Sequence, residues 1–206
     1  MSKNLDEAIS RKEEKCIMSF IPNMITIANF VCGLLAIYAV FVHDIYLGAV
    51  FIITGMLFDF FDGMVARKLD SVSEIGGELD SFADLVTFGV APSILAYSAS
   101  LKDLQFIGMI CALAYSICGM LRLARFNTQQ SKLPTFIGMP IPFAAMCLLI
   151  LCFLNNPVSV AFGTCVLAYL MVSKIKFPHF KKDIAESLKP GSLEDWIDDT
   201  ELQRER

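Results

Sequence analysis

The sequence predicts an all-α membrane protein with six transmembrane helices. Hydrophobic residues make up 55% of its 206 residues and charged residues only 18%, and the mean hydropathy is +0.59. A soluble domain typically carries about 25% charged residues. Apolar stretches of about 20 residues, enough helix to cross a bilayer, recur along the chain. The pattern therefore argues against a signal peptide followed by a globular domain.

Six spans follow from the hydropathy pattern, separated by short connections. They run from Pro22 to Val42, Ile45 to Val65, Leu79 to Ala99, Leu104 to Leu123, Phe136 to Leu154 and Pro157 to Ser173. Residues 1–20 are expected to form a polar arm that can make a short amphipathic helix. Residues 21–182 are expected to form the membrane domain with the candidate site, and residues 183–206 an acidic, flexible tail.

The distribution of cations predicts the orientation in the membrane. Lys and Arg are retained on the cytoplasmic side of a span, and every Lys and Arg except Lys102 lies on or at the edge of one face of the six-span arrangement. We therefore expect a multi-pass protein of the cell membrane with both termini in the cytoplasm. The net charge of −4 comes largely from the tail, and nothing in the sequence predicts nucleic-acid binding.

The cysteines are expected to be packing residues. Six of the seven lie inside apolar spans, and none has a C-x-x-C spacing. Small polarizable thiols are common in protein cores, so neither a zinc site nor a redox site is predicted from them.

Four aspartates stand at the facing ends of the second and third spans. The sequence from Asp59 reads DFFDGMVARKLDSVSEIGGELDSFAD, which has the form D-x2-D-G-x2-A-R-x8-G-x3-D-x3-D. Asp59 and Asp62 are spaced i, i+3 and Asp80 and Asp84 i, i+4, so each pair projects from one helix face. An antiparallel hairpin of these two helices can bring all four carboxylates together.

Such a cluster needs cations, because gathered carboxylates repel one another. Oxygen ligands with no His or Cys nearby favour Mg²⁺ or Mn²⁺, and four carboxylates are enough to hold two such ions. A pair of ions suits displacement at phosphorus. The alternatives are ordinary solvated or capping aspartates, or a proton or ion relay.

The residues between the aspartates are compatible with a nucleotide. Gly63 removes a side chain beside a candidate ligand, Ala66 stands about one turn further along, and Arg67 can pair with a phosphate. Gly76 and Gly77 can relax the loop. Tight helix packing is the alternative explanation for the glycines.

At this motif the chain resembles the CDP-alcohol phosphatidyltransferase family, whose signature it matches at every specified position. The resemblance implies a six-helix membrane fold, a dinuclear metal site with Mg²⁺ or Mn²⁺, transfer of a phosphatidyl group from CDP-diacylglycerol with CMP as leaving product, and a homodimer. It implies that Asp59, Asp62 and Asp80 are metal ligands and that Asp84 is both ligand and general base. It also implies that Asp59, Asp62, Gly63, Ala66 and Arg67 contact the CDP moiety.

The stretch LVTFGVAPS after Asp84 and the run SKIKFPHFKK are most similar to the Bacillus-type members of the serine-using bacterial branch of that family. Three further segments are similar to that bacterial branch. They are PNMITIANFVCGLLAI at Pro22 to Ile37, LRLARFN at Leu121 to Asn127 and PTFIGMPIP at Pro134 to Pro142. L-serine is therefore the acceptor that the resemblance implies. The acidic tail lies outside the resemblance.

Polar residues in these segments are candidates for substrate contacts. Arg122 and Arg125 can bind the acceptor carboxylate or a lipid phosphate, and Asn127 is a weaker candidate for that pocket; anchoring by the positive-inside rule is the alternative. Asn23, Thr26 and Asn29 share one side of the first span. They can line the nucleotide or metal cavity, or form hydrogen bonds between helices.

Two rival functions are also compatible with the sequence. One is the same chemistry with another acceptor, glycerol 3-phosphate or inositol phosphate, which should require a denser basic pocket. The other is a divalent cation transporter, which should place the carboxylates near the middle of the membrane.

Overall fold

The computed structural model describes the backbone of residues 2–68, 74–130, 138–154 and 156–173, and the side chains of residues 22–65, 75–128, 138–154 and 156–173. Every regular element in these ranges is a helix. The elements are α1 (Ser2–Phe41), α2 (Ile45–Lys68), α3 (Glu74–Asp84), η1 (Leu85–Val90), α4 (Ala91–Ala99), η2 (Leu101–Leu104), α5 (Gln105–Arg125), η3 (Phe126–Gln130), α6 (Ile141–Cys152) and α7 (Pro157–Val172).

Four helical stretches in the described ranges are long and apolar enough to cross a membrane. They are Pro22–Phe41, Ile45–Val65, Ile75–Ala99 and Leu101–Thr128. The remaining two helices, α6 with 12 residues and α7 with 16, rise about 18 Å and 24 Å, less than the roughly 30 Å hydrocarbon core. The all-α prediction is thus confirmed, and four of the six expected spans are helices of membrane-spanning length and composition.

The element boundaries differ from the expectations in three places. Helix α3 begins at Glu74 rather than Leu79, so the five residues before Leu79 are helical as well. The fourth span continues past Leu123 as η3. Helix α6 begins at Ile141 rather than Phe136, since Pro140 is its N-cap and the extended backbone there is not helical; residue 136 itself lies outside the described residues.

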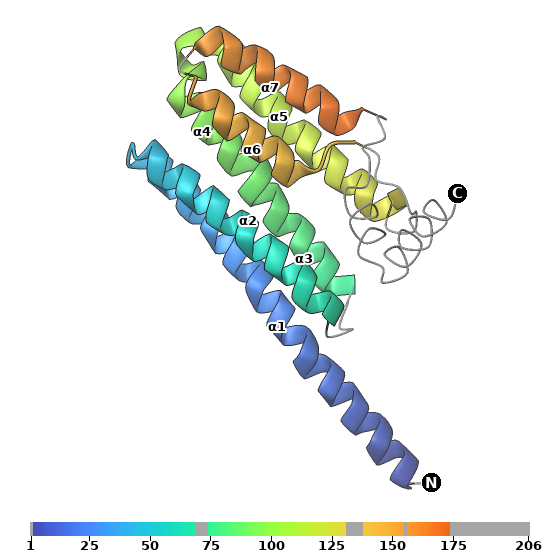
Figure 1. Ribbon diagram of the computed structural model, residues 1–206. Coiled ribbons are helices and arrows are strands. Elements are labelled where there is room, and N and C mark those ends of the chain that lie inside the picture. Colours follow the sequence, from blue (N-terminus) through green and yellow to red (C-terminus); the bar gives the residue numbers. More distant parts are fainter. Residues whose placement is uncertain (1, 69–73, 131–137, 155, 174–206) are drawn as a thin grey trace, which may run out of the picture.

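Figure 1 shows how the helices are arranged. Helices α1 and α2 pack side by side as a hairpin, and residues 2–20 are the first part of α1, which projects beyond the other helices. The rod formed by α3, η1 and α4 lies between this hairpin and the group of α5, α6 and α7. The third span therefore contacts both halves of the bundle.

Local signals at the helix ends explain the tight turns. The Asp44 carboxylate accepts a hydrogen bond from Leu47 N (2.9 Å) at the start of α2, and Asn156 Oδ1 accepts from Val158 N and Ser159 N at the start of α7. Gly138 has φ +89°, and a Cβ there would lie 2.8 Å from the carbonyl O of Met171. Only glycine fits this approach of the segment before α6 to the end of α7.

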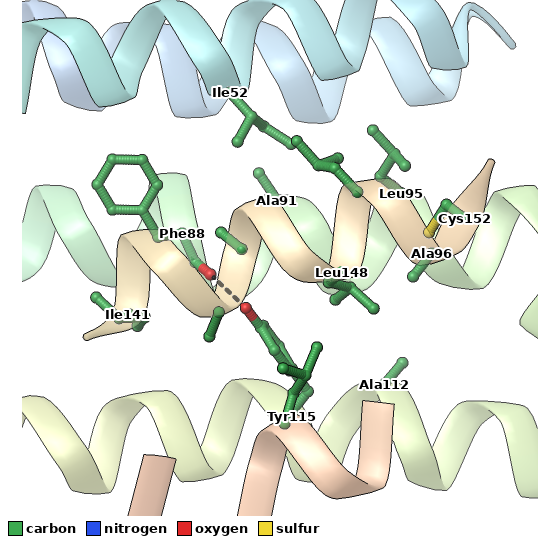
Figure 2. Close-up of a cluster of buried hydrophobic side chains, with 14 of the residues drawn as sticks. Ile52, Phe88, Ala91, Leu95, Ala96, Ala112, Tyr115, Ile141, Leu148 and Cys152 are labelled. Carbon is green, nitrogen blue, oxygen red and sulfur yellow. Dashed lines mark hydrogen bonds between the residues drawn. The ribbon is translucent and has the colours of Figure 1, made fainter. Parts of the chain in front are cut away.

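The core is concentrated around the third span. Phe88, Leu95, Ile52, Tyr115 and Leu148 are almost completely buried, and Figure 2 shows their side chains converging from five helical elements. By contrast, many large apolar side chains on the outside of the bundle are exposed. Exposed apolar surface of this extent fits lipid contact.

Candidate active site and metal centre

The hairpin of α2 and α3 gathers three of the four predicted carboxylates. Asp59 on α2 meets Asp80 and Asp84 on α3, and each offers an oxygen that lies within 4.8 Å of the other two. Asp80 and Asp84 share a face because they are one turn apart. Of the three, Asp84 is the most deeply placed, with 8% of its surface exposed.

The donor chemistry of this cluster fits a hard divalent cation. All three groups are carboxylates, the ligands that Mg²⁺ and Mn²⁺ prefer. Asp59 repels both Asp80 and Asp84, and Arg122 on α5 attracts Asp59 and Asp84 electrostatically. Among the described residues one partly buried arginine faces three carboxylates and does not neutralise them, so a bound cation fits this arrangement.

Asp62 lies outside this 4.8 Å cluster, although it repels Asp59 and Asp80 electrostatically. It is buried, and its Oδ2 accepts a hydrogen bond from the hydroxyl of Thr26 on α1. The Thr26 hydroxyl also lies 3.1 Å from the carbonyl O of Pro22. Among the described residues, the cluster within 4.8 Å therefore contains three carboxylates instead of the expected four, because the fourth engages α1.

Asn29 connects α1 to the cluster. Its Nδ2 donates to Asp84 Oδ1 over 3.4 Å, and the side chain is completely buried. Within the described part of the chain, its buried Oδ1 has no hydrogen-bond partner. The polar side of the first span thus faces the carboxylates through Thr26 and Asn29, as the sequence suggested.

Other candidate nucleotide contacts lie near the same end of the hairpin. Asn23 is half-buried on α1, and Gly63 is half-buried on α2 one residue after Asp62. Ala66 and Arg67 belong to the last turn of α2, and their side chains lie outside the described residues.

The three acceptor candidates have different surroundings. Arg122 lies with its guanidinium carbon 5.7 Å from the centre of the Phe126 ring and is attracted to Asp84. Arg125 Nη1 donates to the carbonyl O of Val172 (2.8 Å), at the end of α7. Asn127 accepts from Ser81 Oγ (3.1 Å) and donates to Glu78 Oε2 (3.3 Å), so it joins η3 to α3. Arg122 is the candidate that is attracted electrostatically to Asp84 and Asp59.

Two features of the site were not expected from the sequence. Thr87, completely buried three residues after Asp84, donates from Oγ1 to the backbone O of Asn29 (3.0 Å). The segment η1, directly after Asp84, is a π-helix. Pro92 inside the third span was an available sign of an irregular helix, because proline lacks the N–H that an α-helix needs.

Comparison with known proteins identifies the family of this chain. The family model of the CDP-alcohol phosphatidyltransferases matches residues 19–174. The chain belongs to the CDP-alcohol phosphatidyltransferase family. This confirms the resemblance found in the sequence, and the family generally depends on divalent metal.

Curated relatives of this phosphatidyltransferase cover most of the chain. The CDP-diacylglycerol–serine O-phosphatidyltransferase of Bacillus subtilis (strain 168) is 69% identical over 174 residues, which are 84% of this chain and 98% of the relative. The enzyme of the same name from Methanocaldococcus jannaschii is 39% identical over 165 residues, 80% of this chain and 76% of the relative. The archaetidylserine synthase of Methanothermobacter thermautotrophicus is 34% identical over 171 residues, 80% of this chain and 73% of the relative.

Proposed function

We propose that this phosphatidyltransferase transfers the phosphatidyl group from CDP-diacylglycerol to L-serine and so produces phosphatidylserine and CMP for phospholipid biosynthesis. The observation that carries the proposal is the 69% identity to a relative named for this reaction over 98% of that relative's length. The cluster of Asp59, Asp80 and Asp84 supplies the chemistry that the reaction needs. A serine product is also named for a relative at 34% identity.

The metal-binding residues in this proposal are the four aspartates of the signature. Asp59, Asp80 and Asp84 would hold Mg²⁺ or Mn²⁺, and Asp62 would join them by leaving Thr26 when two ions are bound. Such ions neutralise phosphate oxygens and stabilise the departing phosphate.

Asp84 is the proposed general base. It takes the proton of the serine hydroxyl, and that oxygen attacks the phosphorus that bears diacylglycerol. The bond from this phosphorus to the bridging oxygen breaks, and the electron pair leaves with CMP. The buried position of Asp84 and its hydrogen bond from Asn29 support this role, since both fix the direction of its carboxylate.

Remaining contacts are assigned by the side of the cluster on which each residue lies. The proposed contacts of the CDP moiety lie on α1 and α2. They are Asn23 and Thr26 on α1 and Asp59, Asp62, Gly63, Ala66 and Arg67 on α2. Arg122 is the proposed partner of the serine carboxylate, because it lies toward Asp84. Arg125 and Asn127 complete the acceptor side in the proposal, although both already hold neighbouring helices.

The proposed membrane arrangement has six spans, with α6 and α7 as the fifth and sixth. Both termini and the carboxylates face the cytoplasm, as the cation distribution predicts. Residues 21–182 would form the catalytic domain of a homodimer, between a polar arm of residues 1–20 and a tail of residues 183–206.

The decisive experiment measures CMP release by the purified protein in detergent with CDP-diacylglycerol and Mn²⁺ or Mg²⁺. L-serine, glycerol 3-phosphate and inositol phosphate are compared as acceptors. Serine-dependent release that Asp84→Asn abolishes supports both the reaction and the base. Asp103→Asn is the matched control, because Asp103 is exposed on η2 outside the carboxylate cluster.

Other outcomes would redirect the proposal. Release with a different acceptor alone would retain the reaction class and reject serine. Failure to release CMP with any acceptor, combined with metal-dependent ion flux in vesicles, would favour the cation transporter.

A further inference from the structure

The turn directly after Asp84 is wider than an α-helical turn. In η1 the N–H of Ala91 donates to the carbonyl O of Val86, five residues earlier. An α-helix would use the carbonyl four residues earlier. Single π-turns of this kind are rare and occur often at functional sites, and this one separates a candidate catalytic carboxylate from the helix that anchors it in the core.

Three consecutive carbonyls of this segment are served by hydroxyl groups. Tyr115 Oη donates to Phe88 O (3.2 Å), Ser116 Oγ to Gly89 O (3.2 Å) and Ser93 Oγ to Val90 O (2.8 Å). The Tyr115 contact is drawn as the dashed line in Figure 2, where the ring rises from α5 toward the third span. Pro92, four residues after Phe88, has no N–H to donate, and the Tyr115 hydroxyl donates to Phe88 O from α5.

The opposite side of the same turn is fixed to α1. Thr87 Oγ1 donates to the backbone O of Asn29, whose side-chain amide donates to Asp84. Gly33 and Gly55 leave the space for this contact, because a Cβ at either position would lie 2.5 Å or 2.6 Å from an atom of Thr87. Thr87 thus sits in a close-fitting niche between α1 and α2.

We propose that Thr87 and Tyr115 are positioning residues that set the direction of the Asp84 carboxylate by holding the wide turn Leu85–Val90 between α1 and α5. The inference rests on the proposed function, because it assigns these residues to the metal site of that reaction. Neither residue is expected to touch substrate or metal.

The width of this turn affects the direction of the Asp84 side chain. One residue corresponds to about 100° of helical rotation, so a turn that closes as an ordinary α-turn changes the direction of Asp84 relative to the core residues of α4 by about that angle. Backbone carbonyls at membrane depth need internal donors. Without the Tyr115 hydroxyl the turn loses a donor to Phe88 O, and without the Thr87 hydroxyl it loses its hydrogen bond to Asn29 O on α1. Asp84, together with Asp80 on the same helix, then turns away from Asp59.

The test uses variants that remove only a hydroxyl. Thr87→Val and Tyr115→Phe keep the shape of the side chain, and Thr164→Val is the matched control. Thr164 is also completely buried, but its hydroxyl donates to Val160 O within its own helix α7. Mn²⁺ affinity is measured on the purified protein without substrate, by electron paramagnetic resonance of the free ion.

We expect Thr87→Val and Tyr115→Phe to weaken Mn²⁺ binding about 10-fold, as removal of outer-shell partners commonly does. The kcat for CMP release should fall while the KM for serine changes little. Thr164→Val should bind Mn²⁺ like the wild type, and Thr87→Ser, which keeps the hydroxyl, should restore most of the affinity.

Equal Mn²⁺ affinity in Tyr115→Phe and Thr164→Val would overturn the inference. So would a Thr87→Ser variant that binds Mn²⁺ as weakly as Thr87→Val, since the loss would then come from packing. If Thr87→Val does not fold, Tyr115→Phe and Thr87→Ser decide the question. A wild-type protein that binds Mn²⁺ but releases no CMP with serine would reject the proposed function alone, because the Mn²⁺ comparison is made without substrate.

Discussion

Asn29 Nδ2 donates a hydrogen bond to Asp84 Oδ1 over 3.4 Å, across 55 positions of sequence. The bond joins the middle of the first span to the candidate base on the third. Asn29 is also the backbone acceptor for Thr87. One buried residue of α1 therefore contacts both the carboxylate and the turn that follows it.

Replacement of this amide should impair catalysis more than folding. Asn29→Leu keeps a side chain of similar size but removes the donor to Asp84 and the unpartnered Oδ1. A hydrogen bond to a charged group contributes about 1.5–3 kcal/mol. We therefore expect its loss to lower the rate of CMP release at least 10-fold. Enzyme kinetics with saturating Mn²⁺ and a thermal unfolding curve measure the two effects. A loss of unfolding temperature without a loss of kcat would contradict the expectation.

Close packing beside the site predicts a sharp difference between two glycines. A Cβ at Gly55 would lie 2.6 Å from Thr87 Cγ2 and 2.9 Å from Asn29 Oδ1, whereas a Cβ at Gly77 meets no atom of the described residues within 4 Å. Gly55→Ala should destabilise the protein by about 1–3 kcal/mol through overpacking. Gly77→Ala should leave stability unchanged or raise it by up to about 1 kcal/mol, since alanine favours the helix. Unfolding in detergent is the measurement, and similar results for both variants would reject the packing model.

The four aspartates should differ in their effect on metal affinity. Asp59, Asp80 and Asp84 already lie within 4.8 Å of one another, while Asp62 engages Thr26. We expect Asp80→Asn to weaken binding of the first Mn²⁺ by about 10-fold or more, and Asp62→Asn to affect it less. A titration that resolves the first and second ions checks this order. If Asp80→Asn and Asp62→Asn lose equal affinity for the first Mn²⁺, Asp62 already belongs to the cluster before metal binds.

The two arginines at the end of α5 should respond differently to substitution by glutamine. Arg125 donates to Val172 O and ties α5 to α7, so Arg125→Gln should cost about 1–3 kcal/mol of stability and change the KM for serine less than Arg122→Gln does. Arg122 is attracted to Asp84 and Asp59. Arg122→Gln should therefore raise the KM for serine or reduce kcat. The reverse pattern would assign the acceptor carboxylate to Arg125.

Much of the candidate site was predictable because it depends on local spacing. The i, i+3 and i, i+4 intervals indicate which aspartates share a helix face, and the short connection between the two spans makes these helices neighbours. The polar stripe of Thr26 and Asn29 was visible for the same reason. The partners of these two residues, Asp62 and Asp84, could not be predicted. A polar stripe shows which side of a helix faces its neighbours but not how the helices are aligned along their axes.

The sequence by itself determined the helical class, the existence of the helices and which carboxylates are candidates for the site. These properties follow from apolar length and helical periodicity, which a single chain segment carries within itself. Tertiary structure decided that three aspartates gather while Asp62 bonds to Thr26, and that the third span widens after Asp84. Both outcomes depend on hydrogen bonds to α1 and α5 across dozens of residues, and such pairings are set only when the helices pack.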